Sequence, residues 1–440
     1  MKRRTYLTGT AVTAFTLSIA GCVGGQETDD EGATNETDNE TDTDTDTGTD
    51  DQDDYDEDDA DEDEDEDDEE THSDLVGTFD DFEDLDGWNV IAGSLEADTD
   101  TVYAGSQSAH VYASESEERV RIVHELEESI DATDVVPGLA LAADRNASPV
   151  IQLYDEDGEY SQYQQFVHEN HPFVRHNFGL TQVSGDPDTS AITEIHIDYW
   201  VGDEHEIDLW IDDLHFVPRV NTGRVMLQFQ GGFESDYTHA YPILEEHGLT
   251  GSTFVATNRV RGSENVEGNR LTEGQLDELV DAGWSVGTVG ARGLQLQTVD
   301  AEDREADILE SLEWLDDHGY DTQAFAFPGG WYDEAAYDLV ESNYDIAYAG
   351  RYQCQGWASN PYNLTRISGG VVERNLTADD MIDALNQTAE YGGYTTITFY
   401  EMDGEDAEAL EATAAHLADL EEAGAIELIH PDEVAEEYLL

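Results

Sequence analysis

The sequence predicts a multi-domain protein in which a β-sandwich is followed by an α/β barrel. Its 440 residues are enough for two domains and a tail. Between about residues 78 and 218, Gly, Asp and Asn separate short alternating runs of apolar residues, which is typical of a sandwich. From residue 224 onward, strand-like and helix-like segments alternate, which indicates repeated β-α units. The first 75 residues follow neither pattern.

The net charge of the chain is extreme. The formal charge is −88, from 105 acidic and 17 basic residues, and Lys2 is the only lysine. Such an acidic excess indicates adaptation to molar salt, where the Debye length falls to about 3 Å and like charges no longer repel one another over distance. The same charge argues against nucleic acid and anionic membrane surfaces as partners.

The N-terminus is predicted to be a Tat-type lipoprotein signal peptide at residues 1–22. A twin-arginine pattern starts at Arg3, and an apolar stretch follows at 11–20. Ile19-Ala20-Gly21-Cys22 resembles a lipobox, so we expect Cys22 to carry a lipid. That lipid would anchor the mature protein to the extracellular face of the cell membrane. An uncleaved anchor helix with an incidental cysteine is the alternative.

Residues 23–75 are predicted to form a disordered acidic stalk. From residue 26 to residue 74 the chain has 29 acidic residues in 49 positions and no Lys or Arg. No hydrophobic core can form from this composition, and self-repulsion keeps the segment extended. A tail that binds divalent cations is the alternative.

Residues 76–219 are expected to form the sandwich. The strand-like runs are Ser108–Tyr112, Arg119–His124, Val150–Tyr154, Glu194–Tyr199 and Ile207–Phe216. The opening F-D-D-F-E-D-L-D-G-W, the segment A-G-S-Q-S-A-H-V and the closing L-W-I-D-D-L-H-F resemble the galactose-binding-type jelly roll of carbohydrate-binding modules. The resemblance implies a structural Ca²⁺ between Glu83 and Asp213, and oxygen ligands suit that ion. Solvated turn acids are the alternative in so acidic a chain.

Sugar binding by this module would require exposed aromatic faces. The candidates are Trp88, Tyr163, Tyr199, Trp200 and Trp210. Trp88 and Trp210 lie inside the motifs that define the module, so we expect them in the core. Adjacent strand residues point to opposite faces, so only one of residues 199 and 200 can be exposed. The sequence therefore does not locate the binding surface.

Residues 220–440 are expected to form the barrel. Arg224–Phe229 is predicted to be a strand, Asp236 to cap a helix that ends near Gly248, and Ser252–Ala256 to be a second strand. Further helices are expected at 271–283 (with Thr272 as its cap), 303–319, 333–342, 378–391 and 406–423. Further strands are expected at 285–287, 323–327, 345–348, 364–367, 395–400 and 426–428.

This half of the chain resembles the polysaccharide deacetylase family, the NodB-homology domain. Members read T-F-D-D-G at the end of the first strand, and Leu227–Gly232 here is L-Q-F-Q-G-G. At the second strand members read A-T-F-F-V, and Ser252–Val255 here is S-T-F-V. Phe325–Asp333, F-A-F-P-G-G-W-Y-D, is similar to a third family motif. The resemblance implies a distorted (β/α) barrel and deacetylation of a glycan by a metal ion, a carboxylate base and an imidazole acid.

The residues that carry this chemistry in the family are replaced here. Gln230 and Gly231 stand at the aspartate pair, which supplies the base and one metal ligand. Val289 and Gly293 stand at the two metal-binding histidines, and Glu401 stands at the acid histidine. Because the flanking residues still match, we expect replacement rather than misalignment. The sequence therefore predicts no metal or other cofactor in the barrel.

Amide and aromatic side chains remain at the predicted rim of the barrel. Gln230, Pro328, Trp331, Tyr332 and Trp357 are the candidate substrate-binding residues. Neutral hydrogen-bonding groups beside flat aromatic faces suit a sugar ring. The two tryptophans could instead cap the barrel core.

The sequence thus favours a lipid-anchored surface protein that binds a surface or extracellular polysaccharide without hydrolysing it. One alternative is an active polysaccharide N-deacetylase, or another carbohydrate esterase, with relocated ligands. Another is a structural envelope protein that binds no sugar. A carboxylate pair of Glu401 with Glu234 or Asp236 would suit glycoside hydrolysis. Cys354 is the only thiol besides Cys22, and without a nearby His it is expected to be a buried apolar residue rather than a nucleophile.

Overall fold

The computed structural model describes residues 73–202, 205–262, 268–320, 323–368 and 376–440. The chain divides into two compact units, Met1–Asp68 and Glu69–Leu440, and every described residue falls in the second unit. The predicted signal peptide, Cys22 and nearly all of the predicted stalk therefore lie outside the described residues. Within the described ranges, no helix is long and apolar enough to cross a membrane.

Two antiparallel sheets of six strands each form residues 73–218, which we call the two-sheet domain. The first sheet has the order β3-β4-β12-β6-β9, with β1 paired to β12, and the second has the order β10-β8-β7-β11-β5-β2. The first sheet consists of β1 (Gly77–Asp80), β3 (Ser94–Asp98), β4 (Ser108–Ala113), β6 (Val135–Ala143), β9 (Val174–His176) and β12 (Ile207–Pro218). The second consists of β2 (Trp88–Ala92), β5 (Arg119–Ile130), β7 (Val150–Tyr154), β8 (Tyr160–Gln164), β10 (Gly179–Ser184) and β11 (Ile192–Trp200).

Apolar side chains from both sheets pack into one hydrophobic core. Val111 and Leu139 enter it from the first sheet, and Ile122 and Ile197 enter it from the second. The alternation of apolar and polar residues along each strand places these side chains on the inner faces of the two sheets. The five predicted strand runs correspond to β4, β5, β7, β11 and β12. The jelly-roll connectivity and the carbohydrate-binding resemblance stay predictions.

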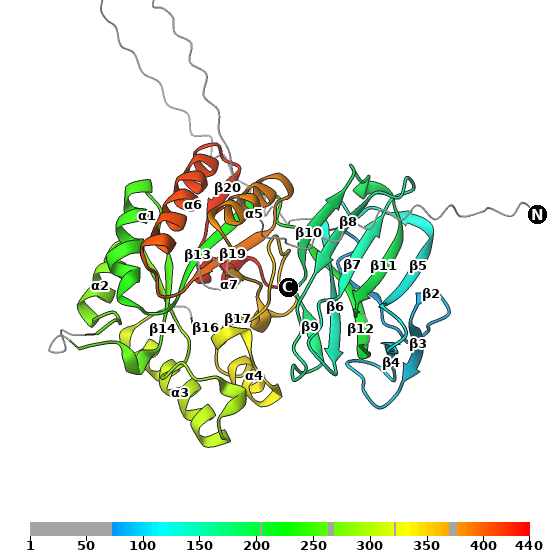
Figure 1. Ribbon diagram of the computed structural model, residues 1–440, viewed down its shortest axis with the longest axis horizontal. Helices are drawn as coiled ribbons and strands as arrows, with labels where there is room; N and C mark the ends of the chain where they lie inside the picture. Colours follow the sequence, from blue (N-terminus) through cyan, green and yellow to red (C-terminus); the bar gives the residue numbers. More distant parts are fainter. Residues whose placement is uncertain (1–72, 203–204, 263–267, 321–322, 369–375) are drawn as a thin grey trace, which may run out of the picture. The chain divides into compact units, whose positions relative to one another are not determined.

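A curled parallel sheet forms the core of residues 219–440, which we call the parallel-sheet domain (Figure 1). The strand order is β17-β16-β15-β14-β13-β19-β18, and β20 pairs with β13. Because β17 and β18 end this path, the sheet is a half-barrel, the partly closed form of the predicted barrel. Its strands are β13 (Gly223–Gly231), β14 (Ser252–Val255), β15 (Ser285–Thr288), β16 (Ala324–Ala326), β17 (Ile346–Tyr348), β18 (Ile367–Ser368), β19 (Tyr394–Phe399) and β20 (Ile426–Leu428).

Helices cover the outer face of the parallel sheet. These are α1 (Tyr241–His247), α2 (Glu273–Asp281), α3 (Ala301–His318), α4 (Glu334–Glu341), α5 (Ala378–Tyr391) and α6 (Gly404–Glu422), while α7 (Pro431–Glu437) follows β20. Leu244 of α1 and Leu410 of α6 share a core with Val225, Leu227 and Phe229 of β13. The alternate residues Gln228 and Gln230 therefore point to the concave inner face of the sheet.

The predicted helix signals hold with one exception. Thr272 caps α2 in a capping box with Gln275, and Gly248 ends α1 with a φ of 73°. Asp236, however, lies inside a π-helical turn, Asp236–Ala240, rather than at a cap. Its side chain is 1% exposed and accepts a hydrogen bond from Oγ1 of Thr253 at 2.9 Å. The prediction that Asp236 caps a helix was therefore wrong, because a strand side chain binds this carboxylate.

Buried hydrogen bonds join the two domains within the second unit. Nδ2 of Asn177 donates to the carbonyl oxygen of Asn360 at 2.7 Å, and Oδ1 of Asn177 accepts from the backbone N–H of Ser359 at 3.0 Å. Nδ2 of Asn363 donates to the carbonyl oxygen of Arg175 at 2.8 Å. Asn177, Asn360 and Asn363 are each at most 4% exposed. The domains therefore meet through satisfied polar groups rather than through a flexible linker.

Candidate functional site

The inner face of β13 carries a buried polar cluster near the carboxyl end of the strand. Arg366, next to β18, is 6% exposed, and its Nη1 donates to Oε1 of Gln230 at 2.9 Å and to Oε1 of Gln228 at 3.3 Å. Its Nη2 donates to the carbonyl oxygen of Phe327 at 2.6 Å. Oγ1 of Thr398 donates to the same oxygen of Gln228 at 2.8 Å. The guanidinium thus meets only neutral acceptors in this cluster.

Gly231, the next residue, leaves no room for a side chain. Its φ is 115°, and an added Cβ would lie 2.5 Å from the ring of Phe233 and 2.9 Å from Nη1 of Arg270. The same Nη1 donates to the carbonyl oxygen of Gly231 at 2.6 Å. An aspartate at this position would therefore require Phe233 and Arg270 to move.

Val289 and Gly293 meet in the loop that follows β15. Val289 is 4% exposed and belongs to the core cluster on the inner face of the sheet. A Cβ at Gly293 would lie 3.4 Å from Cγ2 of Val289, so the structure brings these two predicted positions together. Neither residue offers a metal ligand, and Gln230 and Gly231 offer no carboxylate. The residues present therefore do not fit a catalytic metal ion.

Glu401 lies apart from the cluster around Arg366. Its side chain is exposed and accepts a hydrogen bond from Nδ2 of Asn269 at 2.8 Å. Glu234 pairs with Arg261 at 3.0 Å, and Asp236 is buried beneath Thr253. Asn269 contacts both Glu401 and the backbone N–H of Glu234, so the carboxylate pair that was considered for glycoside hydrolysis stays a prediction. Burial raises the pKa of Asp236 to about 7.

A cavity of about 530 Å³ lies beside the Arg366 cluster. Arg366 and Tyr400 line it from the sheet, Asp383 and Gln387 line it from α5, and the backbone of Gly329 and Gly330 forms a further wall. Its groups can both donate and accept hydrogen bonds. We call this space the rim cavity. Sequence reasoning missed Arg366, although an arginine inside a strand-like L-T-R-I-S segment of an arginine-poor chain was a usable signal.

Comparison with known proteins identifies the parallel-sheet domain. Residues 218–347 match the family model described as Polysaccharide deacetylase. This match supports a polysaccharide deacetylase domain within residues 218–347. YxkH of Bacillus subtilis (strain 168), which is named for the same family, is 24% identical over 118 residues. The match covers 27% of this chain and 40% of YxkH, so the chain spans less than half of that relative.

Several solved deacetylase and esterase structures are similar to part of the chain. The Streptococcus pyogenes deacetylase PplD in complex with acetate is 21% identical, with a TM-score of 0.31, over 36% of this chain and 69% of that chain. Bacillus subtilis PdaA, a family 4 carbohydrate esterase, is 18% identical, with a TM-score of 0.35, over 49% of this chain and 82% of that chain. Each likeness covers less than half of this chain.

In the deacetylase-family domain, two of the predicted sugar-binding rings are covered. Tyr332 is 1% exposed, and its ring stacks on His171 with centroids 3.8 Å apart. Trp331 contacts His168 with centroids 3.4 Å apart. Both histidines belong to the two-sheet domain, and Pro328 is buried as well. Tyr332 is therefore buried against the two-sheet domain, whereas Trp331 packs on it and stays partly exposed.

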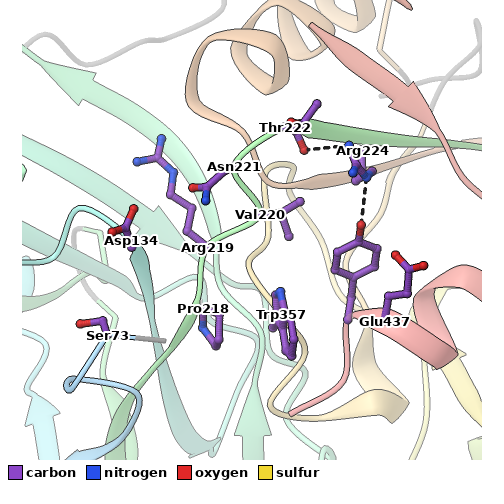
Figure 2. Close-up of a pocket in the computed structure, with 11 residues that line it drawn as sticks. Ser73, Asp134, Pro218, Arg219, Val220, Asn221, Thr222, Arg224, Trp357 and Glu437 are labelled. Carbon is purple, nitrogen blue, oxygen red and sulfur yellow. Dashed lines mark hydrogen bonds between the residues drawn. The ribbon is translucent and has the colours of Figure 1, made fainter. Parts of the chain in front are cut away.

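Trp357 lies at the opposite end of the deacetylase-family domain from Gln230. It lines a cavity of about 800 Å³ together with Arg224 and Tyr438, near the start of β13 (Figure 2). Nε of Arg224 donates to the hydroxyl of Tyr438 at 2.9 Å, and the rings of Trp357 and Tyr438 meet edge to face. Of the predicted substrate-binding residues, only Gln230 contacts the cluster beside the rim cavity.

The predicted calcium ligands lie in the two-sheet domain, and each contacts protein donors. Oδ2 of Asp213 accepts from Nε of Arg175 at 2.5 Å, and Oδ1 accepts from Oγ1 of Thr78 at 2.7 Å. Oε1 of Glu83 accepts from the backbone N–H of Ser106 at 2.6 Å. Among the described residues, no group of three or more His, Cys, Asp and Glu is arranged to hold a metal ion. The calcium site stays a prediction.

The aromatic candidates of the two-sheet domain divide as strand alternation requires. Trp88 and Tyr163 are 6% and 8% exposed and lie in the core, whereas Trp200 is 58% exposed. Trp210 points outward, against our expectation, and stacks on His110 with centroids 5.1 Å apart.

Cys354 is buried in the core of the two-sheet domain, and burial raises the pKa of its thiol to about 11.

Proposed function

We propose that this protein binds a polysaccharide through the rim cavity and does not deacetylate it. The observation that carries the proposal is the Gln230–Arg366 contact, which occupies the place of the family's base with a neutral amide. An amide cannot take a proton from water at neutral pH, and the neighbouring Gly231 offers no side chain. Both parts of the aspartate pair are thus functionally absent.

The polar lining of the rim cavity supports a saccharide as the ligand. Sugar hydroxyls donate and accept hydrogen bonds. Gln387 and Tyr400 can donate to them and accept from them, and the carboxylate of Asp383 can accept. A volume of about 530 Å³ lies within the usual range of about 300–1,000 Å³ for ligand pockets. Membership of the polysaccharide deacetylase family points to the same class of partner.

The anchoring of the protein is a further part of this proposal. The twin-arginine pattern and Cys22 support a lipid anchor on the extracellular face of the membrane. An acidic spacer between this anchor and residue 73 would hold the two domains away from the surface. In that arrangement, the rim cavity would meet extracellular or cell-surface glycan.

The test uses the full chain purified in molar NaCl and has three readouts. These are acetate release from acetylated xylan and N-acetylated chitin oligosaccharides, transition-metal content, and calorimetric binding of the same glycans. We expect binding without acetate release. Gln387→Ala should weaken binding, whereas Asn386→Ala, on the neighbouring exposed position of α5, should leave it unchanged.

The outcomes separate the alternatives. Acetate release that depends on a stoichiometric metal ion would establish an active deacetylase with relocated ligands. Absence of binding to any glycan, by a folded chain, would favour a structural envelope protein. Binding that is unaffected by Gln387→Ala would place the site elsewhere on the molecule.

A further inference from the structure

The outer face of the second sheet of the two-sheet domain carries a group of amide and tyrosine side chains. Ile122, Ile151 and Ile197 fill the core, so the alternate residues of β5, β7 and β11 point outward. We define the amide-tyrosine face by six outward residues that lie on four neighbouring strands, namely Arg121, Gln152, Tyr154, Tyr160, Gln162 and His196. Glu194 and Asp198 of β11 point to the same side of the sheet, so the surface around these six residues also carries two carboxylates.

Strand register places these side chains directly beside one another. Gln152 lies opposite His196 on β11 and opposite Gln162 on β8, and Tyr154 lies opposite Tyr160. Nε2 of Gln152 donates to Oε1 of Gln162 at 2.8 Å, and the hydroxyl of Tyr154 donates to Oε1 of Gln152 at 3.1 Å. These bonds fix the orientation of the amides before any ligand arrives.

The charged groups of this region compensate one another. Arg121 donates through Nη2 to Nδ1 of His196, so the other nitrogen of this imidazole carries the hydrogen and donates to Oε2 of Glu194 at 2.8 Å. Asp198 pairs with Nε of Arg119 at 3.3 Å and with Nη1 of Arg121 at 3.5 Å. The neutral imidazole is consistent with its burial, which lowers the pKa of His196 to about 4. Both guanidinium groups thus contact Asp198, and Glu194 accepts from the neutral imidazole of His196.

Flat rings complete the surface. The centroids of Tyr154 and Tyr160 are 4.7 Å apart, and Tyr154 stacks on His196 at 4.2 Å. Trp200, at the end of β11, is 58% exposed. Gln152 and His196 are only 7% exposed although they point away from the core, so the surrounding side chains hold them firmly. Fixed amides beside tyrosine rings complement a molecule with hydroxyls and an apolar C–H face.

We propose that the amide-tyrosine face binds a neutral, hydroxyl-rich saccharide chain. An anionic polymer would meet Glu194 and the carboxylates of a strongly acidic molecule, and a cationic peptide would find no unpaired carboxylate among the six residues of the face. This site is separate from the rim cavity of the proposed function and does not require that cavity to bind anything. It would give the protein a second contact on a glycan.

The test measures binding of the full chain to immobilised galactan, xylan, mannan and β-glucan, with polygalacturonate as the anionic probe, in molar NaCl. Gln162→Glu keeps the size of the side chain and adds a charge, and Tyr160→Ala removes a ring. We expect a neutral polymer to bind and each variant to lose at least about tenfold in affinity. Tyr112→Ala, on the outer face of the first sheet, is the matched control and should bind unchanged.

Several results would overturn the proposal. These are unchanged affinity in both face variants with intact near-ultraviolet circular dichroism, binding to polygalacturonate alone, or no binding to any neutral probe. Tyr400→Ala, in the rim cavity, distinguishes the two sites. A loss of all neutral-polymer binding in Tyr400→Ala, with none in the face variants, would leave the rim cavity as the binding site and reject the face.

Discussion

Nη1 of Arg366 lies 2.9 Å from Oε1 of Gln230, at the end of β13 where the family resemblance expects a carboxylate. This contact explains why the scaffold tolerates the loss of the aspartate. A buried guanidinium needs acceptors, and Gln228, Gln230 and Phe327 provide them without a second charge. The guanidinium of Arg366 therefore has acceptors on both of its terminal nitrogens, whereas Nε2 of Gln228 is buried without a partner among the described residues.

Arg366→Ala should destabilise the protein strongly, because it removes the donor to three buried acceptors. We expect a loss of about 3 kcal/mol in the free energy of unfolding, measured by denaturant titration in molar salt. Arg145→Ala is the control, since this arginine donates to the exposed carbonyl oxygen of Glu206, and it should cost less than about 1 kcal/mol. Equal losses in the two variants would show that the buried Arg366 contacts contribute no more to the free energy of unfolding than the exposed contact of Arg145.

Restoring the aspartate at Gly231 should fail structurally as well as catalytically. The residue has a φ of 115°, and its Cβ would lie 2.5 Å from Phe233. We predict that Gly231→Asp lowers the free energy of unfolding by about 2–3 kcal/mol and releases no acetate. Gly274→Ala is the control, because a Cβ there meets nothing within 4 Å. A Gly231→Asp variant as stable as the parent would contradict the structure at this loop.

Asp236 should lower the stability of the protein at alkaline pH relative to acid pH. Burial raises the pKa of this carboxyl from 3.8 to about 7, so the folded state keeps a proton that the unfolded state has lost. The stability contributed by that proton is present below about pH 4 and is lost as the pH rises through 7. We predict that Asp236→Asn gains about 2–4 kcal/mol at pH 8 and almost nothing at pH 4. A gain that is independent of pH would show that Asp236 does not titrate in this range.

Two buried histidines should act in the opposite direction. Burial lowers the pKa of His176 and of His215 from 6.5 to about 4, so both are neutral in the folded protein. Their contribution to stability is intact above pH 6.5 and is lost as the pH falls toward 4. Each should cost about 1.4 kcal/mol per pH unit within this window. The measurement is the free energy of unfolding between pH 7 and 5, compared with His215→Gln.

His215→Gln should lose part of that pH dependence while keeping the contact with Oγ of Ser359, which Nε2 of His215 makes at 2.8 Å. Nδ1 of His215 donates to the carbonyl oxygen of Asp213, so Nε2 is the acceptor in the folded state. An identical pH profile in the variant would show that His215 is not responsible for the slope.

The strand and helix frame of the parallel-sheet domain was predictable because it depends on local signals. The apolar run of β13, the capping box at Thr272 and the glycine at 248 act over a few residues. The replaced positions at 230, 231, 289 and 293 were visible for the same reason. The structure adds that Gly231 has no space for a side chain. It also shows that a Cβ at Gly293 would contact Val289.

Contacts between distant segments could not be predicted in this way. Tyr332 belongs to a motif that suggests a rim, yet its ring is covered by His171, which comes from the other domain. Trp357 lines a cavity beside Arg224, near the start of β13, whereas Gln230 lies near the end of that strand. Asp236 is a frequent capping residue, but Thr253 reaches its carboxylate from the neighbouring strand. Sequence patterns give no information on such pairings, since each depends on how the sheets close on one another.

We propose that the parallel-sheet domain holds no catalytic metal ion, because Gln230, Gly231, Val289 and Gly293 offer no metal ligand. The most direct measurement is the zinc content of the full chain after equilibration with excess Zn²⁺ and removal of free ion in molar NaCl. We predict far less than one tightly held zinc ion per chain. One tightly held zinc ion per chain, together with metal-dependent acetate release from an acetylated glycan, would contradict this prediction.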